Sequence, residues 1–253
     1  MRTIGVDLAA GAPGTALAEI VWADGGARLT RLDVGVQDAD IVASVTSGDA
    51  WLGVDCPLGW PDAFVDFVGA HHAEREPALG PVEGHADWRR SLVYRVTDHV
   101  VKERIGRWPL SVSTDRLGVT ALRGAGLLRR LVAAGFPLDR AATERLFEVY
   151  PGGSLRLWGF DTTGYRVDAT RRALLLDELC SRVPWLDLGD FSARAIAKAD
   201  AFDAVIAALS TRAGALGRFE RPGADAIEVA RREGWVVLPE GTVEGLAVEA
   251  AAL

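Results

Sequence analysis

The feature that most constrains the fold is a run of three strand-like segments separated only by tight turns. Residues 2–8 (RTIGVDL), 15–23 (TALAEIVWA) and 27–36 (ARLTRLDVGV) have the composition of strands, and the connections GAPG and DGG are turn-forming. Two strands joined by so few residues pair antiparallel, because a parallel pair needs a crossover of a dozen residues or more. The sequence therefore predicts an antiparallel meander.

The elements that follow the meander alternate between helix and strand. Helices are expected where the apolar spacing is helical, and strands where short apolar runs end at a proline or lie near a turn. The expected helices are 38–47, 168–182 and one long helix at 194–212, and the expected strands are 50–56 (AWLGVDC), 145–150 (RLFEVY) and 235–240 (WVVLPE).

This order of elements is that of the ribonuclease H-like fold. We therefore expect an α/β protein with a mixed five-stranded sheet in the order 3-2-1-4-5 and flanking helices, in which strands one, four and five run parallel. A helical insert is expected between strands four and five, over about residues 61–143, with its best helices at Val96–Ile105 and Ala121–Ala134. No internal repeat or low-complexity linker divides the chain, so residues 1–253 are expected to form one domain.

The charge of the chain is unevenly distributed. The net charge is −7, which argues against a general nucleic-acid coat protein. Residues 89–130, however, contain ten Lys or Arg residues and only three Asp or Glu residues, a net charge of +7. We call this segment the basic strip. It could contact a phosphate backbone, or it could consist of solvated helix faces with ion-pair partners.

The expected location is the reduced cytoplasm, without membrane association. No apolar run approaches the roughly 20 residues needed to cross a bilayer, and the first residues lead directly into a strand rather than a signal peptide. The two cysteines, Cys56 and Cys180, form no metal-binding or redox spacing.

Acidic residues lie at the ends of several apolar segments. Asp7, Asp55 and Glu148 close three of the expected parallel strands, whose carboxyl ends meet at one edge of the sheet. Asp200 and Asp203 open a helix and, being three residues apart, share one of its faces. Converging carboxylates repel each other unless a cation holds them. The sequence predicts a Mg²⁺ or Mn²⁺ site formed by Asp7, Asp55, Asp200 and Asp203, with Glu148 orienting water or completing the shell.

Three of these acids also have a structural explanation. Asp7 could cap the GAPG turn, and Asp55 could form a turn before Cys-Pro. Asp203 could be an acid favoured by the dipole at a helix N-terminus. The functional interpretation is preferred because the strands and the helix are otherwise strongly apolar.

Three further residues are candidates for substrate binding. Arg95 could grip the scissile phosphate in a bidentate manner, and Asp98 could hold a metal-bound water. Tyr150 could stack on a base. The alternatives are a surface ion pair between Arg95 and Asp98, three residues apart, and a core position for Tyr150.

Several stretches of the chain resemble the domain-of-unknown-function 429 family. The resemblance spans nearly the whole length and implies a ribonuclease H-like fold and a metal-dependent nuclease. The spacing Asp200-x-x-Asp203 also resembles the acidic pair on the last helix of bacterial Holliday-junction resolvases. The matching stretches are GVDLA (5–9), GVDCPLGWP (53–61), YRVTD (94–98), EVYPGGSLRLWG (148–159), KADAFDAVIAALSTR (198–212) and REGWVVLP (232–239).

The predicted function is that of a divalent-metal-dependent nuclease or phosphodiester hydrolase acting on nucleic acid or nucleotide. Two ions about 3.5–4 Å apart activate water, neutralise the phosphate and stabilise the leaving oxygen. Asp7 would bridge them, while Asp55 binds one and Asp203 with Asp200 the other. Two alternatives stay open. Residues 7–18 (DLAAGAPGTALA) resemble the first phosphate-binding turn of actin-like ATPases and sugar kinases, which implies an ATP-dependent phosphotransferase. The other is a module that binds nucleic acid or nucleotide without catalysis.

Overall fold

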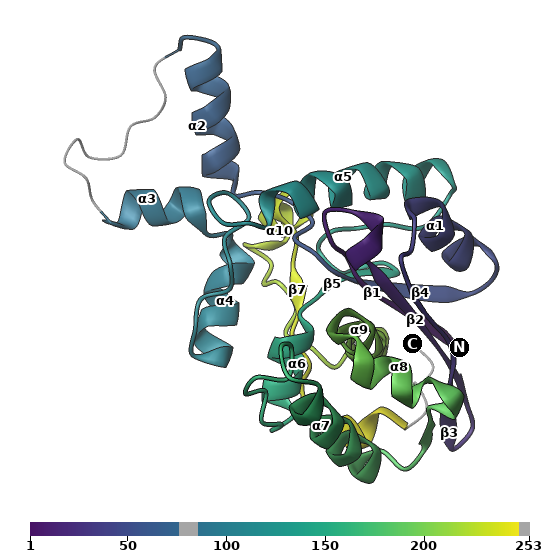
Figure 1. Ribbon diagram of the computed structural model, residues 1–253. Coiled ribbons are helices and arrows are strands. Elements are labelled where there is room, and N and C mark those ends of the chain that lie inside the picture. The colour runs from purple at the N-terminus through teal and green to yellow at the C-terminus, as the bar shows by residue number, and fades with distance from the viewer. Residues whose placement is uncertain (76–85, 248–253) are drawn as a thin grey trace.

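The computed structural model, which describes residues 1–75 and 86–247, is an α/β structure built around a mixed seven-stranded sheet (Figure 1). The spatial order of the strands is β6-β3-β2-β1-β4-β5-β7. β2 is antiparallel to β1 and to β3, whereas the other neighbours pair parallel. The strands are β1 (Arg2–Asp7), β2 (Ala16–Ala23), β3 (Gly26–Val34), β4 (Ala50–Asp55), β5 (Leu146–Val149), β6 (Leu186–Asp187) and β7 (Val236–Val237).

The strand predictions agree with this sheet. The antiparallel meander of β1, β2 and β3 is confirmed. The expected order 3-2-1-4-5 corresponds to the five central strands, and the late strand is present as β7. The sheet is wider than expected, because two-residue strands extend both edges. The sequence analysis did not foresee β6, which has too few residues to show an alternating pattern.

Ten α-helices surround the sheet in the part of the chain that is described. Within that part, none is long and apolar enough to cross a membrane. The helices are α1 (Asp38–Thr46), α2 (Asp62–His72), α3 (Ala86–Val93), α4 (Val96–Ile105), α5 (Gly118–Ala133), α6 (Pro151–Leu157), α7 (Ala169–Arg182), α8 (Ser192–Ala197), α9 (Ala199–Ala215) and α10 (Ile227–Glu233).

The long helix expected at 194–212 is two helices. Lys198 has extended backbone angles, φ −127° and ψ 121°, and separates α8 from α9. Helical periodicity continues across this break, so the apolar pattern alone does not reveal it. The break makes Asp200 part of the first turn of α9 rather than the middle of a longer helix.

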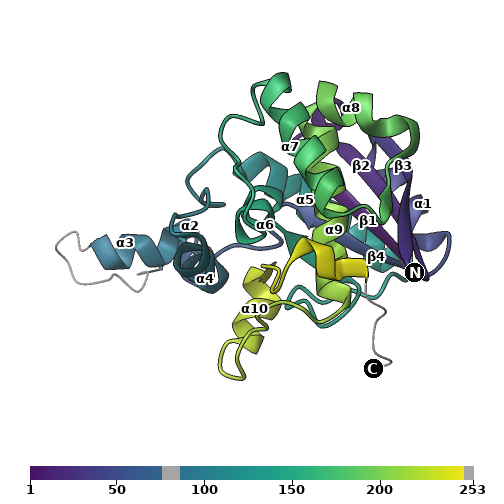
Figure 2. The same ribbon diagram turned by 90° about the horizontal axis from the view of Figure 1, so that it is seen from below.

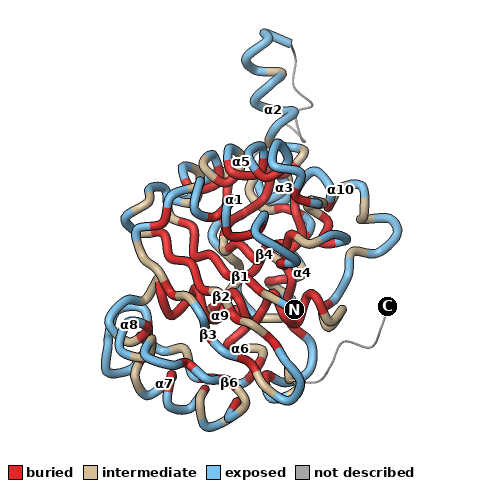
Figure 3. The backbone as a smooth tube through the Cα atoms, turned by 90° about the vertical axis from the view of Figure 1, so that its right-hand side faces the viewer, coloured by how far each residue is buried: buried red, intermediate tan, exposed pale blue. Residues whose placement is uncertain are grey.

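Helices cover the two faces of the sheet in distinct layers (Figures 2 and 3). On one face, α1 and α5 pack on β1 and β4, and Leu127 and Leu131 of α5 join the core formed by Ile4 and Leu52. On the other face, α9 crosses β1, β2 and β4, with α6, α7 and α8 outside it. The predicted insert therefore contributes α5 to the core, while α2 and α3 stand away from the body.

α9 lies unusually close to the sheet because two glycines face it. A Cβ atom on Gly5 of β1 would lie 2.1 Å from the backbone nitrogen of Ala208. One on Gly53 of β4 would lie 2.0 Å from Oγ1 of Thr211. A side chain at Gly5 would displace the backbone of the helix, and one at Gly53 would displace the side chain of Thr211. The glycines thus set the distance between α9 and the carboxyl ends of β1 and β4.

Candidate active site

Asp7 and Asp55 lie side by side where β1 and β4 end. Their Cα atoms are partners in the parallel register of the two strands. Paired residues of adjacent strands point to the same face of a sheet, and successive residues point to opposite faces. Because Gly5 and Gly53, two residues earlier, contact α9, the two carboxylates also face that helix.

The N-terminal turns of α9 add two more of the predicted acids. Asp203 is fully buried, and its Oδ1 atom accepts a hydrogen bond of 2.8 Å from the hydroxyl of Tyr165. Asp200 lies at the rim, with its side chain 37% exposed. We call Asp7, Asp55, Asp200 and Asp203 the acid cluster.

The guanidinium group of Arg166 reaches into the acid cluster. This residue follows Tyr165 in the loop between α6 and α7. Its nitrogens lie 3.2 Å from Oδ2 of Asp203, 3.6 Å from Oδ2 of Asp7 and 3.9 Å from Oδ1 of Asp200. Arg166 therefore neutralises part of the negative charge that the fold gathers here.

Sequence reasoning missed both Tyr165 and Arg166. They lie in an irregular stretch that has neither helical nor strand periodicity, so no local pattern marks them. The signal that could have indicated them is their side-chain chemistry, not their position in a repeating pattern. Several buried acids need a cation or a hydrogen-bond donor, and a Tyr-Arg pair beside Gly164 in a loop provides both.

Burial and mutual repulsion raise the pKa values of the cluster's buried carboxyls. For Asp7 the pKa lies well above its ordinary value, because the group is buried and lies near Asp55 and Asp203. Burial, followed by repulsion from Asp203, raises the pKa of Asp55 to about 8. Burial raises the pKa of Asp203 to about 6, although Arg166 and the hydrogen bond from Tyr165 lower it.

Two buried oxygens of the cluster lack hydrogen-bond partners. These are Oδ2 of Asp7 and Oδ2 of Asp203. A buried carboxylate oxygen without a partner is costly, and hard divalent cations prefer such oxygen ligands. The chemistry of these donors therefore fits Mg²⁺ or Mn²⁺. The side chains of residues 1–75 and 86–247, however, include no group of three or more Asp, Glu, His or Cys residues positioned to hold a metal ion.

Glu148 belongs to a different arrangement from the acid cluster. In the register of β4 and β5 it pairs with Val54, one residue before Asp55, so it points to the opposite face of the sheet. There its two oxygens accept hydrogen bonds of 2.7 and 2.8 Å from Arg95, and Oδ1 and Oδ2 of Asp98 accept others. The backbone N–H of Leu58 donates to Glu148 as well. Glu148 is thus held away from the predicted metal ligands.

Arg95, predicted to bind phosphate, has no unused donor in this arrangement. Its five side-chain N–H groups serve Glu148, Asp98 and the carbonyl oxygen of Glu233. The residue is 3% exposed, and Asp98 is 1% exposed. Their ion pair exists but is buried rather than on the surface. These contacts give both residues a structural role. Both also line the pocket beside the acid cluster, and their contact with substrate stays a prediction.

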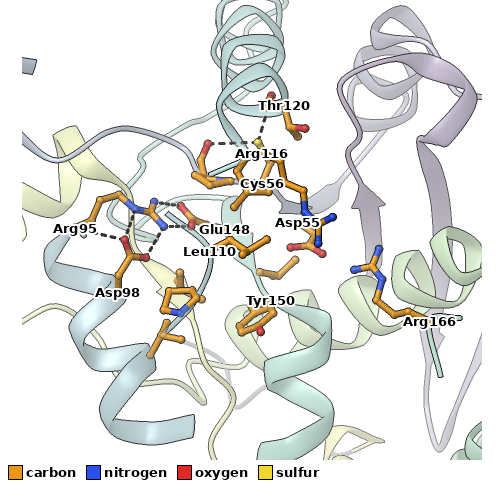
Figure 4. A pocket seen from close by; sticks show the side chains of 16 residues that line it. Asp55, Cys56, Arg95, Asp98, Leu110, Arg116, Thr120, Glu148, Tyr150 and Arg166 are labelled. Carbon is orange, nitrogen blue, oxygen red and sulfur yellow. Dashed lines mark hydrogen bonds and ion pairs between the residues drawn. The ribbon is translucent and has the colours of Figure 1, made fainter. Parts of the chain in front are cut away.

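A pocket of about 620 Å³ opens beside the acid cluster (Figure 4). The carboxylate of Asp55, the guanidinium of Arg166 and the ring of Tyr150 border it. Arg116 adds a second exposed cation, and Leu110 contributes apolar surface. The volume is within the range of small-molecule sites, and the lining is rich in charged side chains of both signs. The predicted contact of Tyr150 with substrate is compatible with this position.

Three cations of the basic strip have partners within the fold. Arg95 is buried, and Arg123 donates to Asp38 and to the carbonyl of Ala9. Arg104 forms an ion pair with Glu220. Local ion pairs account for these residues, whereas the strip's other predicted role, contact with a phosphate backbone, stays a prediction.

The fold and the site define an α/β protein with an acid cluster and a pocket at the carboxyl edge of its sheet. The chain belongs to the family described as "Protein of unknown function (DUF429)", whose sequence profile matches residues 5–228. Comparison with curated proteins and with solved structures finds no significant match.

Proposed function

We propose that the protein is a divalent-metal-dependent phosphodiester hydrolase that acts on nucleic acid or nucleotide in the cytoplasm. The observation that carries the proposal is the convergence of Asp7, Asp55 and Asp203 from three separate elements, with two of their buried oxygens lacking a hydrogen-bond partner. Such an arrangement is unfavourable for folding, and strain of this kind concentrates at functional sites. A divalent cation would relieve it.

We also propose that the sheet is of the ribonuclease H-like type. The support is topological: the central strand order, the parallel pairing of β1, β4 and β5, and the crossing of α9 over β1. In an open α/β sheet of this kind, ligands bind outside the carboxyl ends of the strands. The acid cluster and the pocket lie in that position.

The residues of the cluster share the proposed hydrolysis. Asp7, Asp55 and Asp203 would hold the ion, and Asp200 would add negative charge at the rim. When bound, Mg²⁺ or Mn²⁺ neutralises phosphate charge and lowers the pKa of water. Tyr165 fixes Oδ1 of Asp203 through its hydrogen bond. An attacking water would form the new P–O bond while the ester P–O bond breaks, and the proton that the water loses would pass to the departing ester oxygen. The Arg166 guanidinium would offset the charge of the phosphate in the pocket.

The test is a cleavage screen with Mg²⁺ and Mn²⁺ over single-stranded, duplex and branched DNA and RNA and over nucleotide phosphodiesters. The wild-type chain should cleave at least one class in a metal-dependent way. Asp7→Asn should reduce the rate by 100-fold or more while the protein stays folded, because it removes a ligand charge without changing side-chain volume. Wild-type rates in Asp7→Asn would remove the cluster from the reaction.

No specific contact among the described residues supports either alternative function, the ATP-dependent phosphotransferase or the non-catalytic binding module. In the turn that resembles a phosphate-binding loop, the hydroxyl of Thr15 donates to the carbonyl of Gly11 and accepts from the backbone of Ala9 and from Arg123. These internal contacts already use the hydroxyl that a phosphotransferase would apply to its nucleotide. Binding of labelled oligonucleotides without turnover in Mn²⁺ would favour the non-catalytic alternative.

A further inference from the structure

The chain contains two arginines that neutralise acids near the pocket, and they do so in contrasting ways. Arg95 is buried and makes a full set of hydrogen bonds. Arg166 has a side chain that is 53% exposed, and it lies near oxygens of Asp7 and Asp203 that have no hydrogen-bond partner. The first arginine is fixed by its contacts. The second is held by charge alone.

We propose that Arg166 is an exchangeable counter-ion: its guanidinium group and a divalent cation are alternative occupants of the same carboxylates. The inference rests on the proposed function, since it assumes that the acid cluster is the metal site. It adds that metal binding requires Arg166 to withdraw from the carboxylates.

The geometry of the acid cluster indicates that the Arg166 guanidinium and a divalent cation would bind its carboxylates in turn and not together. Arg166 nitrogens lie 3.2 Å from Oδ2 of Asp203 and 3.6 Å from Oδ2 of Asp7. These are the two unpartnered oxygens that an ion would use, and a cation placed between them would be repelled by the guanidinium. The same crowding explains why the acids, as they now lie, do not form a ready metal site.

The surroundings of Arg166 allow the withdrawal. The residue lies in a loop beside Gly164, which has a φ of +72°, and next to Val167, which is 91% exposed. Its side chain also lines the pocket, alongside Tyr150 and Arg116. A guanidinium displaced from the carboxylates therefore remains near the place where an anionic substrate group would bind.

Exchange has a defined consequence for metal affinity. A cation must replace the interactions that Arg166 makes with the carboxylates, so those interactions weaken its binding. Removing the guanidinium should tighten metal binding, provided that the carboxyls are ionised. All variants are therefore compared at one mildly alkaline pH.

The experiment is isothermal titration calorimetry of the full chain with Mg²⁺ and Ca²⁺. Arg166→Ala should bind either ion about three- to tenfold more tightly than wild type. Arg171→Ala is the matched control, because Arg171 is similarly exposed (54%) and pairs with Asp168 instead of the acid cluster. It should bind as wild type does. Arg166→Lys, which keeps the charge, should remain near wild type.

Free guanidinium ion can replace the missing side chain of Arg166→Ala. This tests whether a guanidinium group competes with metal for the carboxylates or whether any added salt has the same effect. Guanidinium chloride at a low, non-denaturing concentration should weaken metal binding by Arg166→Ala, and the same concentration of NaCl should do so less. Unchanged or weaker metal affinity in Arg166→Ala, while wild type binds metal, would overturn the exchange and leave the proposed function standing. Absence of metal binding in both proteins would overturn the metal site itself and the exchange with it.

Discussion

Arg95 holds both carboxylate oxygens of Glu148, at 2.7 and 2.8 Å, where neither side chain is more than 4% exposed. The same guanidinium also binds Asp98 and the carbonyl of Glu233. These contacts join α4 to β5 and to the end of α10. The cation is therefore part of the scaffold beneath the pocket.

Arg95→Ala should destabilise the fold strongly. The substitution leaves the carboxylates of Glu148 and Asp98 buried without their cation, which costs about 3–5 kcal/mol. Urea denaturation should show the loss. Arg89→Ala, at an exposed position on α3, should change stability by less than about 0.5 kcal/mol. Equal stability in the two variants would contradict the structural role of Arg95.

Asp7→Asn should raise the stability of the metal-free protein. It replaces an ionisable group by a neutral one where burial and the neighbouring Asp55 and Asp203 raise the pKa and so oppose ionisation. We expect a gain of about 1 kcal/mol, or roughly 2–4 °C in Tm for a chain of this size. Thermal melts at pH 8 in a chelator measure it. Asp24→Asn, in the exposed turn after β2, should leave the Tm unchanged.

Stability should fall as pH rises from about 5 to 8.5. Asp55 has a pKa of about 8 in the folded protein and about 3.9 in an unfolded chain, so between these values the folded state binds more protons. Its contribution to stability therefore declines as pH rises through this window, and that of Asp203 declines between about pH 4 and 6. Urea midpoints across pH test this. Asp55→Asn should flatten the slope, and an unaltered slope would contradict the assignment.

Gly5→Ala should disrupt the packing of α9 on the sheet. The new Cβ would lie 2.1 Å from the nitrogen of Ala208 and 2.2 Å from the carbonyl oxygen of Ala204, so the helix backbone would have to move. We expect a loss of about 3 kcal/mol. Gly126→Ala is the control, because no atom lies within 4 Å of its Cβ position on α5. There alanine should be neutral or slightly stabilising.

The elements with clear periodicity could be predicted from sequence. The meander, α4 and the strands ending at Asp7 and Asp55 follow from alternation, helical spacing and turn residues. The break at Lys198 could not, because apolar spacing continues through it. Neither could the edge strand β6, whose pairing with β3 depends on a neighbour far along the chain.

The candidate site could be predicted in part. The position of an acid at a strand end indicates the correct edge of the sheet, and this placed Asp7 and Asp55 together. The face depends on register, which sequence does not fix before the pairing is known. Glu148 pairs with Val54 and so points away from Asp55. Arg166 lies in an irregular loop, and its location is a property of tertiary structure alone.

The acid cluster combines residues that the ribosome adds at widely separated times. Asp7 and Asp55 belong to strands made early, whereas Asp203 arrives with α9, the helix that covers those strands. A nascent chain that has emerged only through β4 carries two adjacent carboxyls with nothing above them. Assembly of the complete acid cluster is thereby postponed until α9 has docked on the sheet.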